Sequence, residues 1–279
     1  MNPFQPMQCS EYAPEKIQPR VLYTLQEKLD GICCIVLPDN RLQTRQGKFW
    51  NRDIMPDMPK NTTGYPVIGE FYLPGRPVAD VMRVASVNGV FLPSALKFLQ
   101  FSVFDVAMPD NAHHTSRLHA ARSAGFHVLW PRMCKGFEQT NEPADDSRGI
   151  FGKTIDDYYK YVLDNRGEGI VVREYICPYI PGTVSPVQWK RKPVHTLEAQ
   201  IIGYQRGLGK FRNTLGALQV IIPGTKIFFT VAGMDNAWRD EFWMCQKQYL
   251  NTLVTVAYDS LSADGVPLKP RVKVPRNYE

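Results

Sequence analysis

The sequence predicts an α+β protein built from two domains. The chain has 279 residues, which is enough for one large domain or two smaller ones. Through the first two thirds, short apolar runs of strand length are mixed with amphipathic helical segments. Beyond Pro193-Val194-His195 the pattern becomes rich in strands, so this stretch reads as a linker. We therefore expect one domain over residues 1–194 and a second over 195–279.

The first domain is expected to begin with an irregular lead-in, residues 1–24, which is rich in proline and has no clear period. Leu25 to Leu37 fits a strand, a turn at Lys28 and a second strand. Further short apolar runs predict strands, because strands of a half-buried sheet are short and rich in branched and aromatic residues. These later strands are Val67–Tyr72, Phe101–Val106 and Gly169–Arg173.

Two helices are expected in this domain. Ser116–Ala124 follows a Thr or Ser that can cap its start, and a glycine stands just beyond its end. Thr154–Arg166 has Asp157 three residues after Thr154, which is the pattern of a capping box. Gly167 suits the left-handed position after the last turn.

The second domain reads as a small β structure with one inserted helix. About 85 residues with this order fit a small barrel, and an OB-type barrel is one such fold. Periodicity alone does not distinguish the OB fold from other small barrels. The expected elements are strands Glu198–Tyr204, Leu215–Ile222, Lys226–Val231 and Leu253–Tyr258, with a helix over Asn236–Leu250.

Composition excludes several classes of protein. The six cysteines show no Cys-x-x-Cys spacing, so structural zinc and a disulfide framework are not expected. The N-terminus does not begin with basic residues followed by an apolar run, so we expect no signal peptide. No apolar stretch is long enough to span a membrane. We expect a soluble cytoplasmic monomer. The net charge of +6 permits a polyanionic partner. His113 and His114 have no metal-ligand spacing and are expected in a surface loop.

Lys28 is the most informative residue, because Lys28-Leu29-Asp30-Gly31 can place an amine nucleophile on a tight turn. An ordinary lysine has a pKa of ~10.4 and is a poor nucleophile at neutral pH. Desolvation and neighbouring cations favour the neutral amine. Lys190-Arg191-Lys192 could supply such cations, and the alternation of a strand would place both lysines on one face with Arg191 on the other.

Five further motifs follow Lys28 in a fixed order. Together, the six resemble the covalent nucleotidyltransferases, and most closely the small ATP-dependent DNA ligases, over residues 25 to 235. The later motifs are Thr44-Arg45-Gln46-Gly47-Lys48, Val67-Ile68-Gly69-Glu70-Phe71-Tyr72, Phe101-Ser102-Val103-Phe104-Asp105-Val106, Glu168-Gly169-Ile170-Val171-Val172-Arg173 and Val187-Gln188-Trp189-Lys190-Arg191-Lys192-Pro193.

The resemblance implies an ATP-grasp-like nucleotidyltransferase domain followed by an OB-fold domain. It implies that ATP adenylates Lys28, with Mg²⁺ or Mn²⁺ required, and that the enzyme then seals nicks in duplex DNA. Lys190 and Lys192 would flank the α-phosphate, and Glu168 would bind the metal. The implied nucleotide contacts are Gln26, Glu27, Asp30, Gly31, Arg45, Glu70, Phe104 and Lys190, with Phe104 stacked on adenine and Glu70 on the ribose.

The resemblance also implies DNA contacts, at Arg45 and Lys48 in the first domain and at Arg206, Lys210 and Arg212 in the second. One departure is Cys33, which stands where the family has an arginine. Arg45 or Arg173 could replace that contact.

Three alternative functions stay open. An RNA ligase and an mRNA-capping guanylyltransferase share the fold that the resemblance implies. A non-catalytic OB-type nucleic-acid-binding protein would carry no covalent nucleotide on Lys28.

Overall fold

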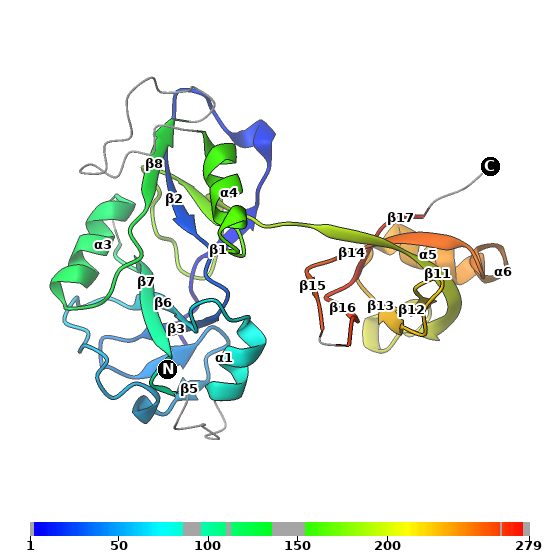
Figure 1. Cartoon of the computed structure of the whole chain (residues 1–279), viewed down its shortest axis with the longest axis horizontal. Helices are drawn as coiled ribbons and strands as arrows, with labels where there is room; N and C mark the ends of the chain where they lie inside the picture. Colours follow the sequence, from blue (N-terminus) through cyan, green and yellow to red (C-terminus); the bar gives the residue numbers. More distant parts are fainter. Residues whose placement is uncertain (1–2, 86–95, 110–112, 136–153, 263, 276–279) are drawn as a thin grey trace. The chain divides into compact units, whose positions relative to one another are not determined.

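The chain forms two compact units, Met1–Lys192 and Pro193–Glu279. The computed structural model describes residues 3–85, 96–109, 113–135, 154–262 and 264–275. Figure 1 labels the elements of both units. The expected α+β class is confirmed, since sheets and helices are mixed along the chain.

One five-stranded sheet of the first unit carries the strand that precedes Lys28. Its strand order is β1-β10-β9-β2-β8, and all neighbouring strands are antiparallel except β1 and β10. Helix α4 packs on the β2 and β9 part of this sheet. The bounds are β1 Gln8–Glu11, β2 Leu22–Glu27, β8 Arg132–Lys135, β9 Ile170–Glu174, β10 Val184–Arg191 and α4 Ile155–Asp164.

The second sheet of this unit is antiparallel and has the order β5-β4-β3-β6-β7. Helix α3 packs on β7, and α1 contacts β3 and β6. The bounds are β3 Ile32–Val36, β4 Leu42–Thr44, β5 Phe49–Trp50, β6 Val67–Tyr72, β7 Gln100–Val106, α1 Val78–Val84 and α3 His114–Ser123, with short 3₁₀ turns η1 Pro14–Lys16 and η2 Arg52–Ile54.

The chain passes from one sheet to the other at Lys28. Strands β2 and β3 have the expected positions in the sequence, but they do not pair, because β2 belongs to the first sheet and β3 to the second. The lead-in over residues 1–24 is also not wholly irregular, since β1 forms an edge of the first sheet. Its partner β10 is about 175 residues further along the chain, so local sequence could not reveal the pairing.

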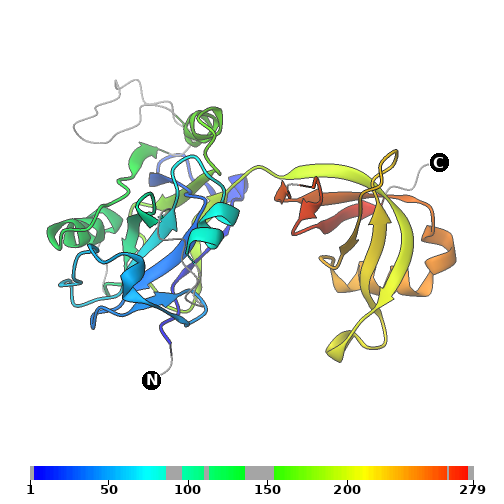
Figure 2. The ribbon, with the colours of Figure 1, turned by 60° about the horizontal axis from the view of Figure 1, so that its bottom comes forward.

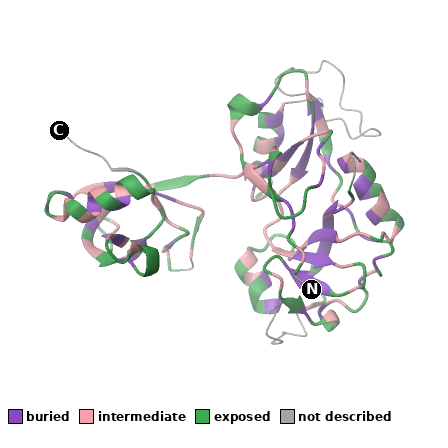
Figure 3. Ribbon diagram, turned by 180° about the vertical axis from the view of Figure 1, so that it is seen from behind, coloured by how far each residue is buried: buried purple, intermediate pink, exposed green. Residues whose placement is uncertain are grey.

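Three apolar clusters support the two sheets. The largest lies on one face of the second sheet and includes Phe71, Phe101 and Phe126. Another packs α4 against the first sheet through Tyr158 and Val162. A smaller cluster joins the sheets through residues such as Ile68 and Tyr179. The strands that carry these side chains form the purple interior of the unit in Figure 3.

The ends of the two helices differ from the expectation in detail. The capping box of α4 is confirmed, with Thr154 and Asp157 bonding reciprocally. The left-handed residue after α4 is Arg166, with φ of 63°, and not Gly167. Gly167 has no side chain for a different reason: a Cβ there would lie 2.4 Å from Val162. Helix α3 begins at His114, two residues earlier than expected.

The second unit contains a five-stranded antiparallel sheet with the order β13-β12-β11-β14-β17. Figure 2 shows the helical segment beside these strands, and Phe242 and Tyr249 anchor it in the core. The expected helix is confirmed, but it divides into two at Cys245. The bounds are β11 His195–Arg206, β12 Leu215–Ile221, β13 Phe228–Val231, α5 Asn236–Met244, α6 Gln246–Tyr249, β14 Leu253–Tyr258, β15 Ser260–Leu261, β16 Pro267–Leu268 and β17 Arg271–Pro275, with a 3₁₀ turn η3 Gly209–Phe211.

The sheet does not close into a barrel among the residues that the structure describes, because β13 and β17 are its edges and do not pair. The OB fold of this unit thus stays a prediction. Among the described helices, none is long and apolar enough to cross a membrane.

Candidate active site

The turn that carries Lys28 is held by three different elements of the first unit. The backbone N–H of Lys28 donates to the carbonyl of Gly169, which precedes β9, at 2.8 Å. The carboxylate of Asp30 accepts the N–H of Val78 at the start of α1. Gly31 lies so close to β6 that a Cβ would be 2.1 Å from the carbonyl oxygen of Phe71. A side chain at Gly31 would therefore displace the turn.

The amine of Lys28 forms an ion pair with Glu168. Their side chains are 28% and 25% exposed, so both are within reach of a ligand from solvent. The residue after Glu168 must be a glycine, because the φ of Gly169 is 150°. A Cβ on Gly169 would also lie 2.2 Å from the carbonyl oxygen of Arg191. The backbone next to Glu168 is thus held against the end of β10.

Glu70 is the second carboxyl group close to Lys28. Burial raises the pKa of Glu70 to about 8; the charge of Lys28 opposes this change, while Glu168 and Asp30 add to it. A carboxyl group with this pKa is largely protonated at neutral pH and can donate a hydrogen bond. Cys33 lies opposite Glu70 in the β3–β6 pair, and burial strongly raises the pKa of this thiol, so Cys33 is not a reactive nucleophile.

Strand β10 supplies the basic residues near Lys28. Lys190 pairs with Val171 of β9, which in turn pairs with Gln26 of β2, so all three side chains share one face of the sheet. The amine of Lys190 lies 3.0 Å from the carboxylate of Glu11. Lys192 follows the last residue of the strand.

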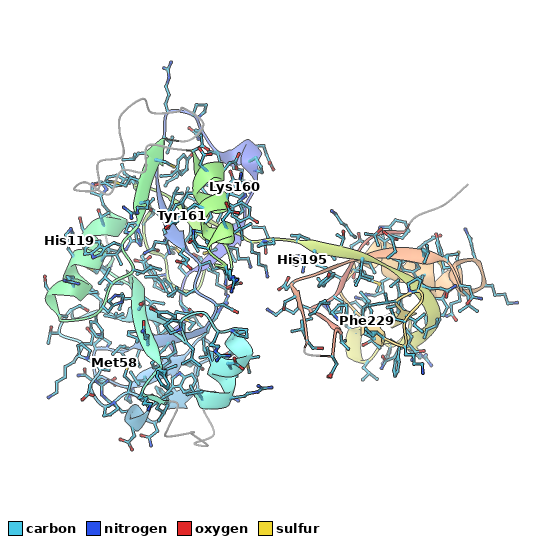
Figure 4. The ribbon with its side chains drawn as sticks, viewed as in Figure 1. Met58, His119, Lys160, Tyr161, His195 and Phe229 are labelled. Atoms are coloured by element: carbon cyan, nitrogen blue, oxygen red, sulfur yellow. The ribbon has the colours of Figure 1, made fainter. Side chains whose placement is uncertain are left out.

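Arg191 faces the opposite side of the sheet, where helix α4 lies. It forms an ion pair with Asp156 and its guanidinium lies 4.1 Å from the centre of the Tyr159 ring. Figure 4 labels Lys160 and Tyr161 on the same helix. Arg191 is therefore separated from Lys190 as strand alternation predicts.

Gln26 and Glu27 end β2 just before the Lys28 turn. The Gln26 side chain is buried, donates to the carbonyl of Leu129 and accepts from Arg173. Only its backbone is therefore left for a ligand. Burial raises the pKa of Glu27.

Arg45 and Phe104 lie on the second sheet. The guanidinium of Arg45, just beyond β4, donates to the side chain of Gln8 at 2.6 Å. Its charge lowers the pKa of Glu70, which places it in the electrostatic surroundings of that residue. Phe104 is half-buried beside the cluster that joins the two sheets. Lys48 lies in the turn between β4 and β5, where its N–H donates to Thr44.

The described residues contain no cluster of three metal-ligating side chains. A single carboxylate beside the nucleotide site still suits Mg²⁺, because this ion commonly takes one or two protein carboxylates and completes its shell with water and phosphate oxygens. Glu168 is the partly exposed carboxylate that could hold such an ion. Arg206, Lys210 and Arg212 belong to the second unit and are considered below.

A buried polar network behind the site was not predicted. Arg117 of α3 forms an ion pair with Asp105 of β7 and donates to the carbonyl of Cys177. His114 is fully buried, so the expectation of a surface loop at this residue is wrong. Its Nε2 lies 2.9 Å from the carbonyl oxygen of Phe104, and its Nδ1 lies 3.4 Å from the hydroxyl of Thr24 on β2.

The chemistry of these partners fixes the tautomer of His114. A carbonyl oxygen only accepts, so Nε2 carries the proton and donates to Phe104, which leaves Nδ1 to accept from Thr24. Burial and the nearby charge of Arg173 lower the pKa of His114 to about 3, so the ring is neutral.

Arg173 cannot replace the arginine that Cys33 displaces. It is buried, donates to Gln188 at 2.7 Å and also binds Gln26. Arg45 is exposed and remains the candidate.

A cavity of about 640 Å³ lies elsewhere in the first unit, lined by residues that include Met58, Phe126 and His127. None of the predicted site residues lines it. Met58 is labelled in Figure 4. The cavity therefore does not help to define the site.

Comparison with known proteins supports the fold. No protein-family model matches the sequence, and no curated protein matches it significantly. A solved structure from a structure–function analysis of Lig E DNA ligases, concerned with DNA binding by a minimal scaffold, matches with a TM-score of 0.74. The identity is 17%, and the match covers 99% of this chain and 100% of the other.

Two further structures, named Pmar-Lig Pre and Pmar-Lig PreS3, match with TM-scores of 0.71 and 0.70 at 16% identity. They cover 99% of this chain and 69% and 68% of theirs. The chain therefore has the fold of these DNA ligases, as the resemblance in the motifs predicted.

Proposed function

We propose that this protein is an ATP-dependent DNA ligase that seals nicks in duplex DNA. The observation that carries the proposal is the position of Lys28, which is fixed between the two sheets beside Glu168 and Glu70. The same order of motifs that singled out Lys28 belongs to a chain with a ligase fold over its whole length.

The first step joins AMP to Lys28. The Nζ atom attacks the α-phosphorus of ATP, a P–N bond forms, and the P–O bond to the β-phosphate breaks, so that pyrophosphate leaves. The amine must be neutral to attack, and it loses a further proton as the P–N bond forms. Lys190 and Lys192 stabilise the charge that builds up on the phosphate oxygens.

Two further transfers complete the reaction. An oxygen of the 5′-phosphate at the nick attacks the phosphorus of AMP, and Lys28 leaves as the amine. The 3′-hydroxyl then attacks the 5′-phosphate, a phosphodiester bond forms, and AMP leaves. Splitting one difficult condensation into three displacements is the advantage of the covalent intermediate.

The remaining residues of the first unit bind the nucleotide in this proposal. Phe104 stacks on adenine, and Glu70 hydrogen-bonds the ribose. The backbone of Gln26 and Glu27 contacts the base, and Asp30 and Gly31 hold the turn. Arg45 binds phosphate, as the contact that replaces the missing arginine at position 33.

Glu168 would hold a divalent cation, Mg²⁺ or Mn²⁺. When bound there, the ion would neutralise charge on the phosphates of ATP.

The domain over residues 195–279, within the second unit, acts in this proposal as an OB-type domain that binds duplex DNA. Arg206, Lys210 and Arg212 are exposed cations that contact phosphates, and such contacts position a protein without reading sequence. Arg45 and Lys48 contribute further phosphate contacts from the first unit, and the enzyme acts as a monomer.

A sealing assay tests the proposal. The protein is incubated with ATP, Mg²⁺ and a labelled duplex that has a single nick with a 5′-phosphate, and the joined strand is measured on a denaturing gel. Parallel reactions use an RNA duplex with the same nick, and GTP in place of ATP. We expect the parent protein to join the DNA strands with ATP but not with GTP, and we expect Lys28→Ala to join no strands. Joining of RNA only would indicate an RNA ligase, and absence of joining would contradict the proposal.

A further inference from the structure

Arg191 stands between the two lysines that the proposed function places at the phosphates, but its own side chain contacts other parts of the protein. Its guanidinium lies 4.1 Å from the ring centre of Tyr159 on α4 and 4.7 Å from that of Tyr12, just beyond β1. It also forms an ion pair with Asp156 in the first turn of α4. Side chains from two segments that are distant in the sequence thus meet at one guanidinium, which is 24% exposed.

An arginine is suited to this position because its planar, permanently charged group can pair with a carboxylate and pack on aromatic rings at the same time. Tyr12 and Tyr159 are half-buried against the apolar cluster that packs α4 on the first sheet. Burial raises the pKa of both phenols, and the charge of Arg191 opposes this rise. The contacts of Arg191 therefore attach the end of β10 to side chains that the core already holds.

The backbone of Arg191 lies against the turn that carries Lys28. Arg191 pairs with Ile170 of β9, and Ile170 also pairs with Glu27 of β2. The carbonyl oxygen of Arg191 leaves no room for a Cβ on Gly169, whose own carbonyl accepts the N–H of Lys28. A displacement of Arg191 would therefore move the end of β10 relative to the Lys28 turn.

The lysines on either side of Arg191 depend on the same strand end. The N–H of Tyr12 donates to the carbonyl of Lys190 at 3.0 Å, and the amine of Lys190 lies 3.0 Å from the carboxylate of Glu11. Lys192 directly follows the last residue of β10. The direction in which the chain leaves Arg191 therefore sets the position of Lys192.

We propose that Arg191 is a positioning residue for the transfer of AMP to Lys28. Its contacts with the two tyrosines and the aspartate hold the end of β10 and so place the adjacent lysines relative to the attacking amine. This inference rests on the proposed function, in which those lysines stabilise charge on the phosphate while the P–N bond forms and pyrophosphate leaves. Arg191 itself contacts no nucleotide. Because such groups act in the transition state, their displacement lowers the rate more than it weakens ATP binding.

Single-turnover self-adenylation over a range of ATP concentrations separates these two effects. Arg191→Met should lower the rate constant at saturating ATP roughly tenfold, as expected for misplaced groups. The ATP concentration that gives half the maximal rate should stay close to that of the parent. Arg41→Met is the matched control, because Arg41 also pairs with an aspartate, Asp39, and lies 4.7 Å from the ring centre of Phe49. The control should react as the parent does.

A double-mutant cycle tests whether Arg191 acts through the ring of Tyr159. Tyr159→Phe keeps the ring and should react as the parent does, whereas Tyr159→Leu removes it and should be slow. Combining Tyr159→Leu with Arg191→Met should give a rate close to that of the slower single variant. If the two losses multiply instead, the side chains act independently and the inference is wrong.

Asp156→Asn keeps the test valid if Arg191→Met does not fold. Asp156 is 68% exposed, so this variant removes the ion pair and leaves the core packing intact. It should show a smaller loss in the same direction, with every rate measured well below the melting temperature of the variant. Parental rate constants in both Asp156→Asn and Tyr159→Leu would overturn the inference.

The parent protein distinguishes a failure of this inference from a failure of the proposed function. If the parent forms no adduct with ATP, the proposed function is wrong, and the inference fails with it. If the parent forms the adduct and Arg191→Met reaches the parental rate constant at saturating ATP, only the positioning role is wrong. A loss of equal size in Arg41→Met would reveal a general effect of losing a paired arginine and would also overturn the inference.

Discussion

The two glutamates near Lys28 differ in their surroundings, and this difference suggests separate tasks. Glu168 forms the ion pair with the amine and is partly exposed, whereas Glu70 lies on β6 and has a pKa near 8. A charged, accessible carboxylate suits a cation, and an uncharged carboxyl group suits a hydrogen bond to a neutral hydroxyl.

Replacing Glu168 should impair turnover without weakening DNA binding. We expect Glu168→Gln to lower the rate of nick sealing on the order of 100-fold, the range typical for losing one group that stabilises charge in the transition state. Glu174→Gln, at the far end of strand β9, is the control. Sealing is measured at limiting Mg²⁺, and binding is measured by fluorescence anisotropy. A variant that seals at the parental rate would show that Glu168 holds no metal.

Glu70 should make the stability of the protein depend on pH. Its pKa in the folded protein, about 8, lies above the ordinary value of 4.5, so folding favours the protonated form. Stability from this group is present in full below pH 4.5 and is lost as the pH rises through 8. Glu70→Gln lacks this titration, so its melting temperature relative to the parent should increase from pH 5 to pH 9. A difference in melting temperature that stays constant across this range would contradict the assigned pKa.

Helix α3 connects the two sheets through its first turn, at His114. The imidazole binds the backbone of Phe104 on one sheet and the side chain of Thr24 on the other. It therefore helps to fix the ring proposed to hold adenine relative to the strand that leads to Lys28.

We expect His114→Ala to lower the free energy of unfolding by ~1–3 kcal/mol, because the buried carbonyl of Phe104 loses its donor. His114→Gln keeps a donor of similar reach and should lose less. The folded pKa of His114, about 3, is below the ordinary 6.5, so its contribution is present above pH 6.5 and is lost as the pH falls toward 3. Denaturant titrations at pH 7 and pH 4 measure both effects. If Gln and Ala variants are equally unstable, the hydrogen bond is not the important contact.

Several strands could be predicted from the sequence, because they are short, apolar and bounded by turn residues. Val67–Tyr72 and Leu253–Tyr258 have the expected bounds. Pairings between distant segments could not be predicted from the sequence. Strand β1 pairs with β10, and β2 separates from β3, through contacts that no local pattern encodes. His114 was missed for the same reason, since burial at a helix start depends on the sheets that meet there.

For the whole molecule, the order of six motifs predicted the fold although no family model recognises the chain. Residues that hold the backbone in place within these motifs, such as Gly31 and Gly169, have contacts that leave no space for a Cβ. In the proposed function, the unit with Lys28 carries the nucleotide chemistry and shares the binding of DNA with the second unit.

The central claim is that Lys28 becomes covalently bound to AMP, and one measurement tests it most directly. The protein is incubated with Mg²⁺ and ATP labelled at the α-phosphate, or with GTP labelled in the same way, and is separated on a denaturing gel. The account predicts an acid-labile adduct with ATP, located on Lys28 by mass spectrometry of the digested protein and absent from Lys28→Ala. An adduct that persists in Lys28→Ala, or one that forms with GTP and not with ATP, would contradict it.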